Sequence, residues 1–213
     1  MKRALLAVFC GLLAMAQQPE LEITAPAGGS IFNPGQTITL TVKSPANVSF
    51  TSLGVIGEDP FGISDLATSV PAQFSFTIPV QIDCGDYAFS ADGTTASGKL
   101  VEAAPILLDV EPSDFPKSLV ANLSTLTFGT VGETFPLSVF AKFADDSVLT
   151  VTRSSFMTYT SSSVSVATVD KHGVVTAVAS GNGSIKAIYT VGADTRSLIV
   201  PIAVSSRSTE GNE

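Results

Sequence analysis

Few side chains in this 213-residue chain could perform acid–base or nucleophilic chemistry. Its one histidine, His172, lies in a predicted tight turn over Asp170–Gly173, between two β-branched runs. A Ser-His-Asp triad would have to use His172, yet a tight hairpin turn provides neither an oxyanion hole nor a cleft that excludes water. The chain also lacks the Gly-x-Ser-x-Gly elbow of many hydrolases. We therefore predict that the protein is not an enzyme and that none of its residues is catalytic.

Metal binding would have to use carboxylates, because nitrogen and sulfur ligands are too few. A zinc site needs three or four such ligands, whereas this chain has one histidine and two cysteines. Calcium prefers carboxylate and carbonyl oxygens, so the candidate metal ligands are the acidic loop residues Asp59, Asp65, Asp145 and Asp146. None of these loops has the D-x-D-x-D-G spacing of a calcium loop. Solvated loops are therefore the alternative, and calcium is the one cofactor left open.

Aromatic side chains offer a third kind of site, because exposed rings can stack on sugars. Phe61 lies within a glycine- and proline-containing loop, so it is the candidate ligand-binding residue. Phe74, Phe76, Phe89 and Tyr159 occupy alternating positions of predicted strands. That alternation places one set of side chains on the buried face, so we predict that these four belong to the core.

Residues 1–16 have the features of a secretory signal peptide. Two basic residues are followed by the short apolar segment Ala4–Leu13 and by the small-x-small cleavage site Ala14-Met15-Ala16. The apolar segment is too short to span a bilayer comfortably. We expect export to the periplasm, the cell surface or the medium, with no transmembrane segment after cleavage. A lipoprotein signal that ends at Cys10 is the alternative.

Cleavage of the signal peptide changes both the charge and the cysteine count. Nine basic residues then face 19 acidic ones, so the net charge falls from −8 to −10. An acidic surface repels phosphate backbones, which excludes nucleic-acid binding. An extracellular protein or a cell-envelope polysaccharide is the expected partner. Cys84 becomes the only cysteine, and we predict a small buried residue rather than a reactive thiol, because Asp83 and Asp86 would raise its pKa.

An internal repeat indicates two tandem modules. Gly35–Val42 aligns with Gly132–Val139 at an offset of 97 residues, and Gly85 aligns with Gly183 at an offset of 98. Modules of about 100 residues have the size of immunoglobulin-like sandwiches. The segment Gln36–Lys43 alternates apolar and hydroxyl residues, as expected for a strand with one buried face. The glycines before both aligned segments are predicted to occupy turns with positive φ.

We place the first module at residues 20–104 and the second at 105–204. Pro105 marks the predicted boundary, and Ile106–Val110 is expected to open the second module. A closing hairpin of the first module is expected over Asp92–Gly93, a dipeptide that favours tight turns. Residues 205–213 are polar and are predicted to form a disordered tail.

The second module resembles the bacterial immunoglobulin-like domain of group 2 over about residues 106–204. Val166–Asp170 and Gly173–Ala177, separated by the tight turn, are the most specific part of the likeness, and Gly132-Glu133-Thr134 precedes them in the family's order. Tyr159 stands where many members have tryptophan. Asp145-Asp146 replaces the Asp-Gly turn of relatives, which leaves Asp146 or Ser147 to adopt the left-handed conformation.

The resemblance and the repeat together imply an all-β protein with two tandem immunoglobulin-like sandwiches. The family implies a role at cell surfaces as a structural spacer, an adhesion module or an assembly unit. A glycan- or calcium-binding accessory module is the alternative, and an enzyme is the third class considered.

Overall fold

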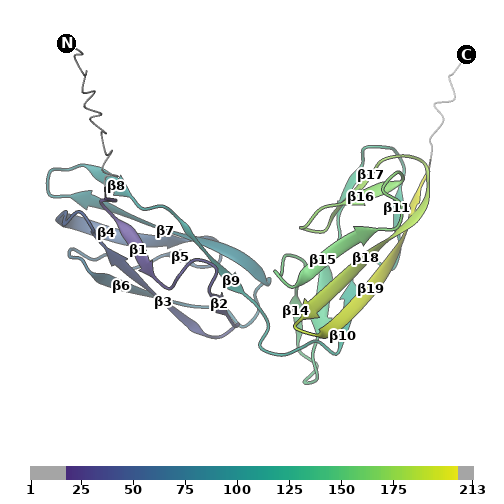
Figure 1. Ribbon diagram of the computed structural model, residues 1–213, viewed down its shortest axis with the longest axis horizontal. Helices are drawn as coiled ribbons and strands as arrows, with labels where there is room; N and C mark the ends of the chain where they lie inside the picture. The colour runs from purple at the N-terminus through teal and green to yellow at the C-terminus, as the bar shows by residue number, and fades with distance from the viewer. Residues whose placement is uncertain (1–17, 206–213) are drawn as a thin grey trace, which may run out of the picture.

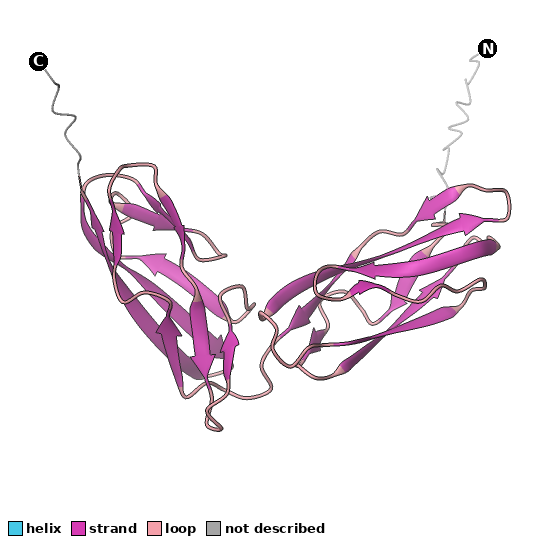
Figure 2. Cartoon of the chain, turned by 180° about the vertical axis from the view of Figure 1, so that it is seen from behind, coloured by secondary structure: helices cyan, strands magenta, loops and turns pink. Residues whose placement is uncertain are grey.

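A computed structural model describes residues 18–205, which form strands and loops and contain no helix. Figures 1 and 2 show two elongated sandwich modules that meet at an angle near the middle of the chain. The predicted all-β fold with two sandwiches is confirmed. The predicted signal peptide and residues 206–213 of the predicted tail lie outside the described residues. Within residues 18–205, no helix is long and apolar enough to cross a membrane.

The first module packs a three-stranded sheet against a six-stranded sheet. The three-stranded sheet has the order β1-β3-β6, with β1 Glu22–Ala25, β3 Thr37–Lys43 and β6 Ala72–Thr77. The larger sheet has the order β2-β9-β7-β4-β5, and β8 also pairs with β7. Its strands are β2 Ile31–Phe32, β4 Phe50–Gly57, β5 Gly62–Ile63, β7 Gly85–Thr95, β8 Leu100–Glu102 and β9 Ile106–Val110.

The alternation predicted for Gln36–Lys43 is present in β3. Ile38, Leu40 and Val42 are buried in the first core, while the threonines between them face away from it. Gly35 precedes the strand with φ of 85°, as predicted, and its amide donates to the carbonyl of Ile78. Phe74, Phe76 and Phe89 are buried in the same core, as predicted.

Two details of the first module correct the sequence analysis. Ile106–Val110 does not open the second module: as β9 it pairs with β7 and β2, and Leu108 and Val110 are buried in the first core. Asp92 and Gly93 do not form the hairpin turn, because both lie inside β7. A Cβ on Gly93 would lie 2.8 Å from the Phe50 ring, so this glycine permits close packing rather than a turn.

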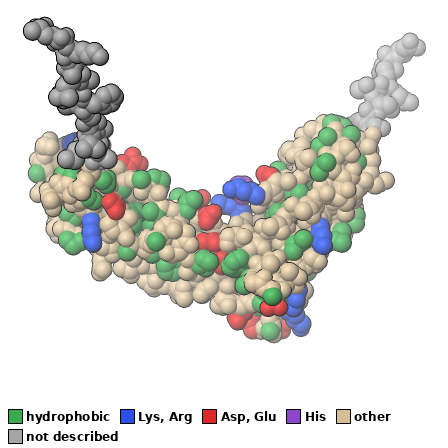
Figure 3. Space-filling model, viewed as in Figure 1, with side chains coloured by type: hydrophobic (Ala, Val, Ile, Leu, Met, Phe, Trp, Pro, Cys, Tyr) green, Lys and Arg blue, Asp and Glu red, His purple; other side chains and the backbone are tan. Residues whose placement is uncertain are grey.

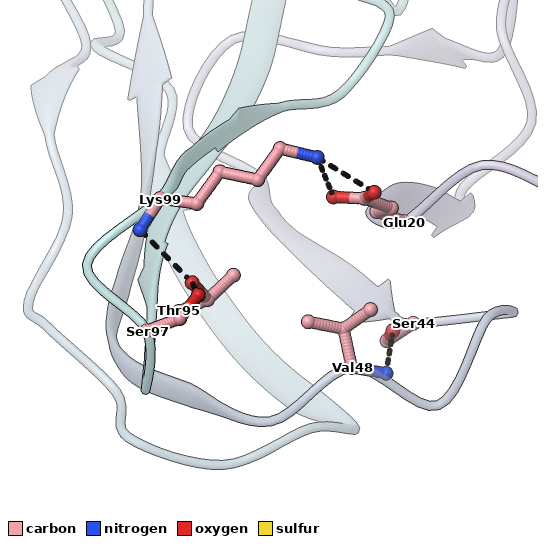
Figure 4. A network of polar contacts seen from close by, with 6 residues as sticks. All are labelled: Glu20, Ser44, Val48, Thr95, Ser97 and Lys99. Atoms are coloured by element: carbon pink, nitrogen blue, oxygen red, sulfur yellow. Dashed lines mark hydrogen bonds and ion pairs between the residues drawn. The ribbon is translucent and has the colours of Figure 1, made fainter.

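Polar contacts close the far end of the first module (Figure 4). Lys99 Nζ forms an ion pair with Glu20 at 2.7 Å, and the Lys99 amide donates to Thr95 Oγ1 at 3.0 Å. The Val48 amide donates to Ser44 Oγ at 2.8 Å. The Lys99–Glu20 pair is the only ion pair within residues 18–205, and exposed pairs of this kind contribute at most about 1 kcal/mol.

The second module contains three small sheets. Their orders are β10-β13-β14, β11-β19-β18-β15 and β12-β17-β16. The strands are β10 Ser118–Ala121, β11 Leu126–Phe128, β12 Thr134–Pro136, β13 Val139–Lys142, β14 Val148–Thr150, β15 Met157–Ser161, β16 Ala167–Val169, β17 Val174–Ala177, β18 Gly181–Val191 and β19 Asp194–Val204.

The alternating run that begins at Gly132 serves two sheets rather than one. β12 pairs with β17, the chain leaves that sheet at Leu137, and β13 pairs with β10 and β14. Pro136 has no amide hydrogen to donate, which favours the end of pairing there. Gly132 has φ of 90°, as predicted for the turn that precedes the run.

The other predicted turns of the second module are present. Asp146 adopts the left-handed conformation with φ of 65°, which decides between it and Ser147. The Asp170 carboxylate accepts the amides of His172 and Val174, both at 2.9 Å, so it fixes the turn that joins β16 to β17. Tyr159, predicted as core, is half-buried at the margin of the second core, and its hydroxyl donates to the Thr152 carbonyl.

Candidate functional site

The junction between the modules is the most specialised region of the described chain. The Cys84 amide donates to the Thr150 carbonyl at 2.8 Å, and Gly85 forms a parallel bridge with Arg153. Gly85 has φ of 142°, and a Cβ there would lie 2.7 Å from the Arg153 carbonyl oxygen. Only glycine therefore allows the start of β7 to approach the second module this closely.

Cys84 inserts its side chain into the second module. It precedes β7 of the first module, yet its thiol packs with the second hydrophobic core and is 1% exposed. Burial raises the pKa of the thiol well above its ordinary value, and the nearby Glu111 and Asp83 carboxylates raise it further. Cys84 is thus buried, as predicted, but its side chain packs in the core of the second module.

Glu111 connects the modules through hydrogen bonds. It follows β9 of the first module and is fully buried. Its carboxylate accepts hydrogen bonds from Ser154 Oγ at 2.6 Å, the Ser155 amide at 2.6 Å and Ser155 Oγ at 3.0 Å, all in the second module. The Glu111 carbonyl accepts Asn33 Nδ2 from the first module at 2.9 Å. One residue therefore binds both modules.

A polar cleft of about 530 Å³ opens beside this junction. Glu58, Asp59, Asp83 and Tyr87 of the first module line it, together with Arg153 of the second. Figure 3 shows acidic and basic side chains gathered on the concave side between the modules. The Tyr87 hydroxyl donates to the Asp83 carbonyl at 2.5 Å, and burial, followed by the charge of Asp83, raises the pKa of Tyr87 to about 12. Such a cleft can offer hydrogen bonds and charge to a polar ligand.

Phe61, the candidate sugar-stacking residue, is not freely exposed. Its ring lies against Phe76, Tyr87 and Phe89, with ring centroids 6.3, 5.3 and 5.0 Å apart. The glycine- and proline-containing loop folds back onto the first core, which leaves Phe61 half-buried. The expectation of an exposed ring is therefore wrong, because aromatic packing competes with exposure at this position.

The candidate calcium ligands are exposed and lie apart. Asp59 and Asp65 belong to loops of the first module, whereas Asp145 and Asp146 lie in the β13–β14 turn of the second. Asp145 accepts hydrogen bonds from the Ser147 hydroxyl at 2.6 Å and the Ser147 amide at 3.0 Å, which lower the pKa of its carboxyl. Within residues 18–205, no three acidic, histidine or cysteine side chains are grouped to hold a metal.

The junction residues were not selected from the sequence, although one signal was available. Asp109 and Glu111 alternate with Leu108 and Val110 at the end of an apolar run. Acidic residues at one face of an otherwise apolar strand are rare inside a fold unless they have partners. His172 lies exposed in the predicted turn.

Comparison with known proteins agrees with this architecture. Residues 130–200 match the bacterial Ig-like domain (group 2) family. No curated protein sequence matches the chain significantly.

Solved structures provide further neighbours. Fibronectin(III)-like modules of Clostridium thermocellum CbhA share 17% identity over 45% of this chain and 99% of that chain, with a TM-score of 0.36. Domains 4 and 5 of the S-layer protein SbsC share 14% identity over 90% and 100%, with a TM-score of 0.34. Extracellular domains 3–5 of Drosophila OTK share 15% identity over 88% and 68%, with a TM-score of 0.35. Likeness this low carries no argument about function.

The family match lies within the second module and covers the segments on which the resemblance was based, including the tight turn between β16 and β17. Within the second module, residues 130–200 therefore match the bacterial Ig-like domain of group 2.

Proposed function

We propose that the protein is a secreted or cell-surface, non-enzymatic module protein that serves as a structural spacer or assembly unit. Export to the periplasm, the cell surface or the medium is part of this proposal, and it is supported by the sequence of residues 1–16. An extracellular protein or a cell-envelope polysaccharide is the proposed partner.

The insertion of Cys84 into the second core is the observation that carries this proposal. Two modules joined only by a flexible linker would be free to reorient. Here, the Cys84 side chain, the close approach of Gly85 to Arg153 and the bonds from Ser154 and Ser155 to Glu111 resist reorientation. A spacer that presents its ends at a defined angle needs such a junction.

Residual dipolar couplings on the mature protein, residues 17–213, test the proposal directly. A rigid junction aligns both modules with one common tensor, and small-angle scattering gives one narrow distribution of dimensions. A Gly85→Ala variant, which crowds the Arg153 carbonyl, provides the reference for a loosened junction. Independent alignment tensors for the two modules of the natural chain at every pH tested would overturn the rigid-spacer proposal.

A glycan- or calcium-binding accessory module is the second candidate, favoured by the polar cleft beside the junction. Retention of the mature protein on purified cell envelopes and insoluble polysaccharides, with and without calcium, tests it. An Arg153→Ala variant removes the cationic side chain of the cleft, and Lys171→Ala in the β16–β17 turn is a matched control for charge. Retention that falls with Arg153→Ala alone would support binding in the cleft, and retention unaffected by either variant would exclude it.

A further inference from the structure

Two carboxylates are buried together at the junction. Asp109 and Glu111 are two positions apart, so their side chains leave the chain on the same face, opposite Leu108 and Val110. Glu111 is 0% exposed and Asp109 is 5% exposed. The Oδ1 atom of Asp109 is buried and has no hydrogen-bond partner among residues 18–205.

Neither acid forms an ion pair within the described part of the chain. The single ion pair there, Lys99–Glu20, lies at the far end of the first module. The titratable groups that face the two acids are the Cys84 thiol, in the segment before β7, and the Tyr189 phenol of β18. Burial raises the pKa of both groups, and the charges of Glu111 and Asp109 raise it further. Asp83 adds a negative charge near Cys84. Ser154 and Ser155 contribute hydrogen bonds but no charge.

Two buried carboxylates of this kind cannot both ionise cheaply. Burial disfavours the charged form of Glu111, and the negative charge of Asp109 adds repulsion. Burial is the largest cause that raises the pKa of Glu111, to about 7, and Asp109 raises it as well, while the bonds from Ser154 and Ser155 oppose the shift.

We propose that Glu111 keeps a proton beside the buried Asp109, and that loss of this proton releases the two modules from their fixed angle. The inference rests on the proposed spacer function, because it describes how that rigid junction is controlled. Below the transition, the pair carries one negative charge and the junction is closed. Above it, two like charges meet in a buried interface, so water enters and the modules separate.

The direction of the pH dependence follows from the raised pKa. A carboxyl whose folded pKa lies above its unfolded value contributes its full stability at low pH. That stability falls as the pH rises from the ordinary value of 4.5 through about 7, and the loss is complete above that range. The junction is therefore expected to be closed in mildly acidic surroundings and open in alkaline ones.

Carbon-13 NMR of glutamate-labelled mature protein, together with residual dipolar couplings at about pH 5.5 and about pH 8.5, tests the proposal. The natural chain is expected to show one glutamate that titrates near 7 and a common alignment tensor only at the lower pH. Glu111→Gln keeps an acceptor for the Ser155 donors without a charge, so it should be closed at both pH values. Asp109→Asn should lower the pKa of Glu111, and because the pair then carries at most one negative charge, its junction should stay closed at both pH values. Glu102→Gln, on exposed β8, should leave it unchanged.

The outcomes separate the two proposals. A common tensor at both pH values in the natural chain would overturn the proton switch and leave the spacer intact. Independent tensors at both pH values would overturn the spacer itself.

Discussion

Two glycines in equivalent settings show how the modules differ. Gly85 opens β7 with φ of 142°, and Gly181 opens β18 with φ of 150°. A Cβ on Gly181 would lie 2.9 Å from Val166 Cγ2, within its own module, whereas a Cβ on Gly85 would lie 2.7 Å from the Arg153 carbonyl oxygen of the other module. A glycine with positive φ at the start of a long strand therefore permits a close contact within the second module at Gly181, and a close contact between the modules at Gly85.

Because of this difference, residues of the first module at the junction pack into the second core, and the junction is more than a linker between two independent modules. Cys84 of the first module is buried beside Tyr189 and Val151 of the second. Variants of the junction residues should therefore lower both the stability of the second core and the rigidity of the junction. Junction variants that change only one of the two properties would break the comparison.

The largest effect is expected from a charge placed in the second core. Val175 is fully buried there, so Val175→Asp should cost several kcal/mol and unfold the second module, because an unpaired buried charge has no compensation. The melting temperature and the reactivity of Cys84 toward a thiol reagent measure the two consequences. If the second module unfolds while Cys84 stays protected, the thiol belongs to the first module, contrary to the structure.

Val169→Asp on the neighbouring strand provides a graded control. Val169 is half-buried at the margin of the second core. The charge can reach water from that position, so a smaller cost of about 1–3 kcal/mol is expected. A cost equal to that of Val175→Asp would place Val169 deeper than the structure does.

Alanine at Gly85 and at Gly181 should cost similar amounts of stability, but only the substitution at Gly85 should loosen the junction. Gly85→Ala should loosen the junction and cost about 2–4 kcal/mol, because backbone strain is added to a clash with the Arg153 carbonyl. Gly181→Ala should destabilise the second module through Val166 and preserve the common alignment tensor. Dipolar couplings and melting curves distinguish the two.

Gly98→Ala measures the cost in stability that comes from backbone strain alone, without a steric clash. Gly98 has φ of 81°, and no atom lies within 4 Å of the point that an added Cβ would occupy. The substitution should therefore cost only about 1–2 kcal/mol. If Gly85→Ala costs no more than Gly98→Ala and leaves the modules aligned together, the close approach to Arg153 does not constrain the junction.

The sequence predicted what depends on local pattern. Alternation in β3, the turn at Asp170–Gly173 and the left-handed residue at Asp146 all follow from a few neighbouring residues. It could not assign Ile106–Val110 to a module, because an apolar strand pairs equally well with either side and tertiary packing decides. The expected exposure of Phe61 was wrong for the same reason. The composition of its loop indicated exposure, but its ring packs against three other aromatic rings in the fold.

A moderate effect is expected from removal of the inserted thiol. Cys84→Ala should cost about 1–2 kcal/mol, since it leaves a small void in the second core while the backbone bond to Thr150 remains. In the natural chain, burial raises the pKa of the thiol, so it should resist alkylation until the protein unfolds. Rapid alkylation under native conditions would mean that the junction opens often enough to expose the side chain.

The smallest effect concerns Asp145. The pKa of its carboxyl is lowered, whereas that of the buried Glu111 is raised. Bonds from the Ser147 hydroxyl and amide lower the pKa of Asp145, so its contribution to stability is present above its ordinary pKa and is lost as the pH falls through the lowered value. Ser147→Ala should raise that pKa toward the ordinary value without a measurable change in melting, because the turn is exposed. Carbon-13 NMR of labelled aspartate measures the shift. A resonance that titrates normally in the natural chain would show that the turn is not formed in solution, and one that moves on addition of calcium would revive Asp145 and Asp146 as metal ligands.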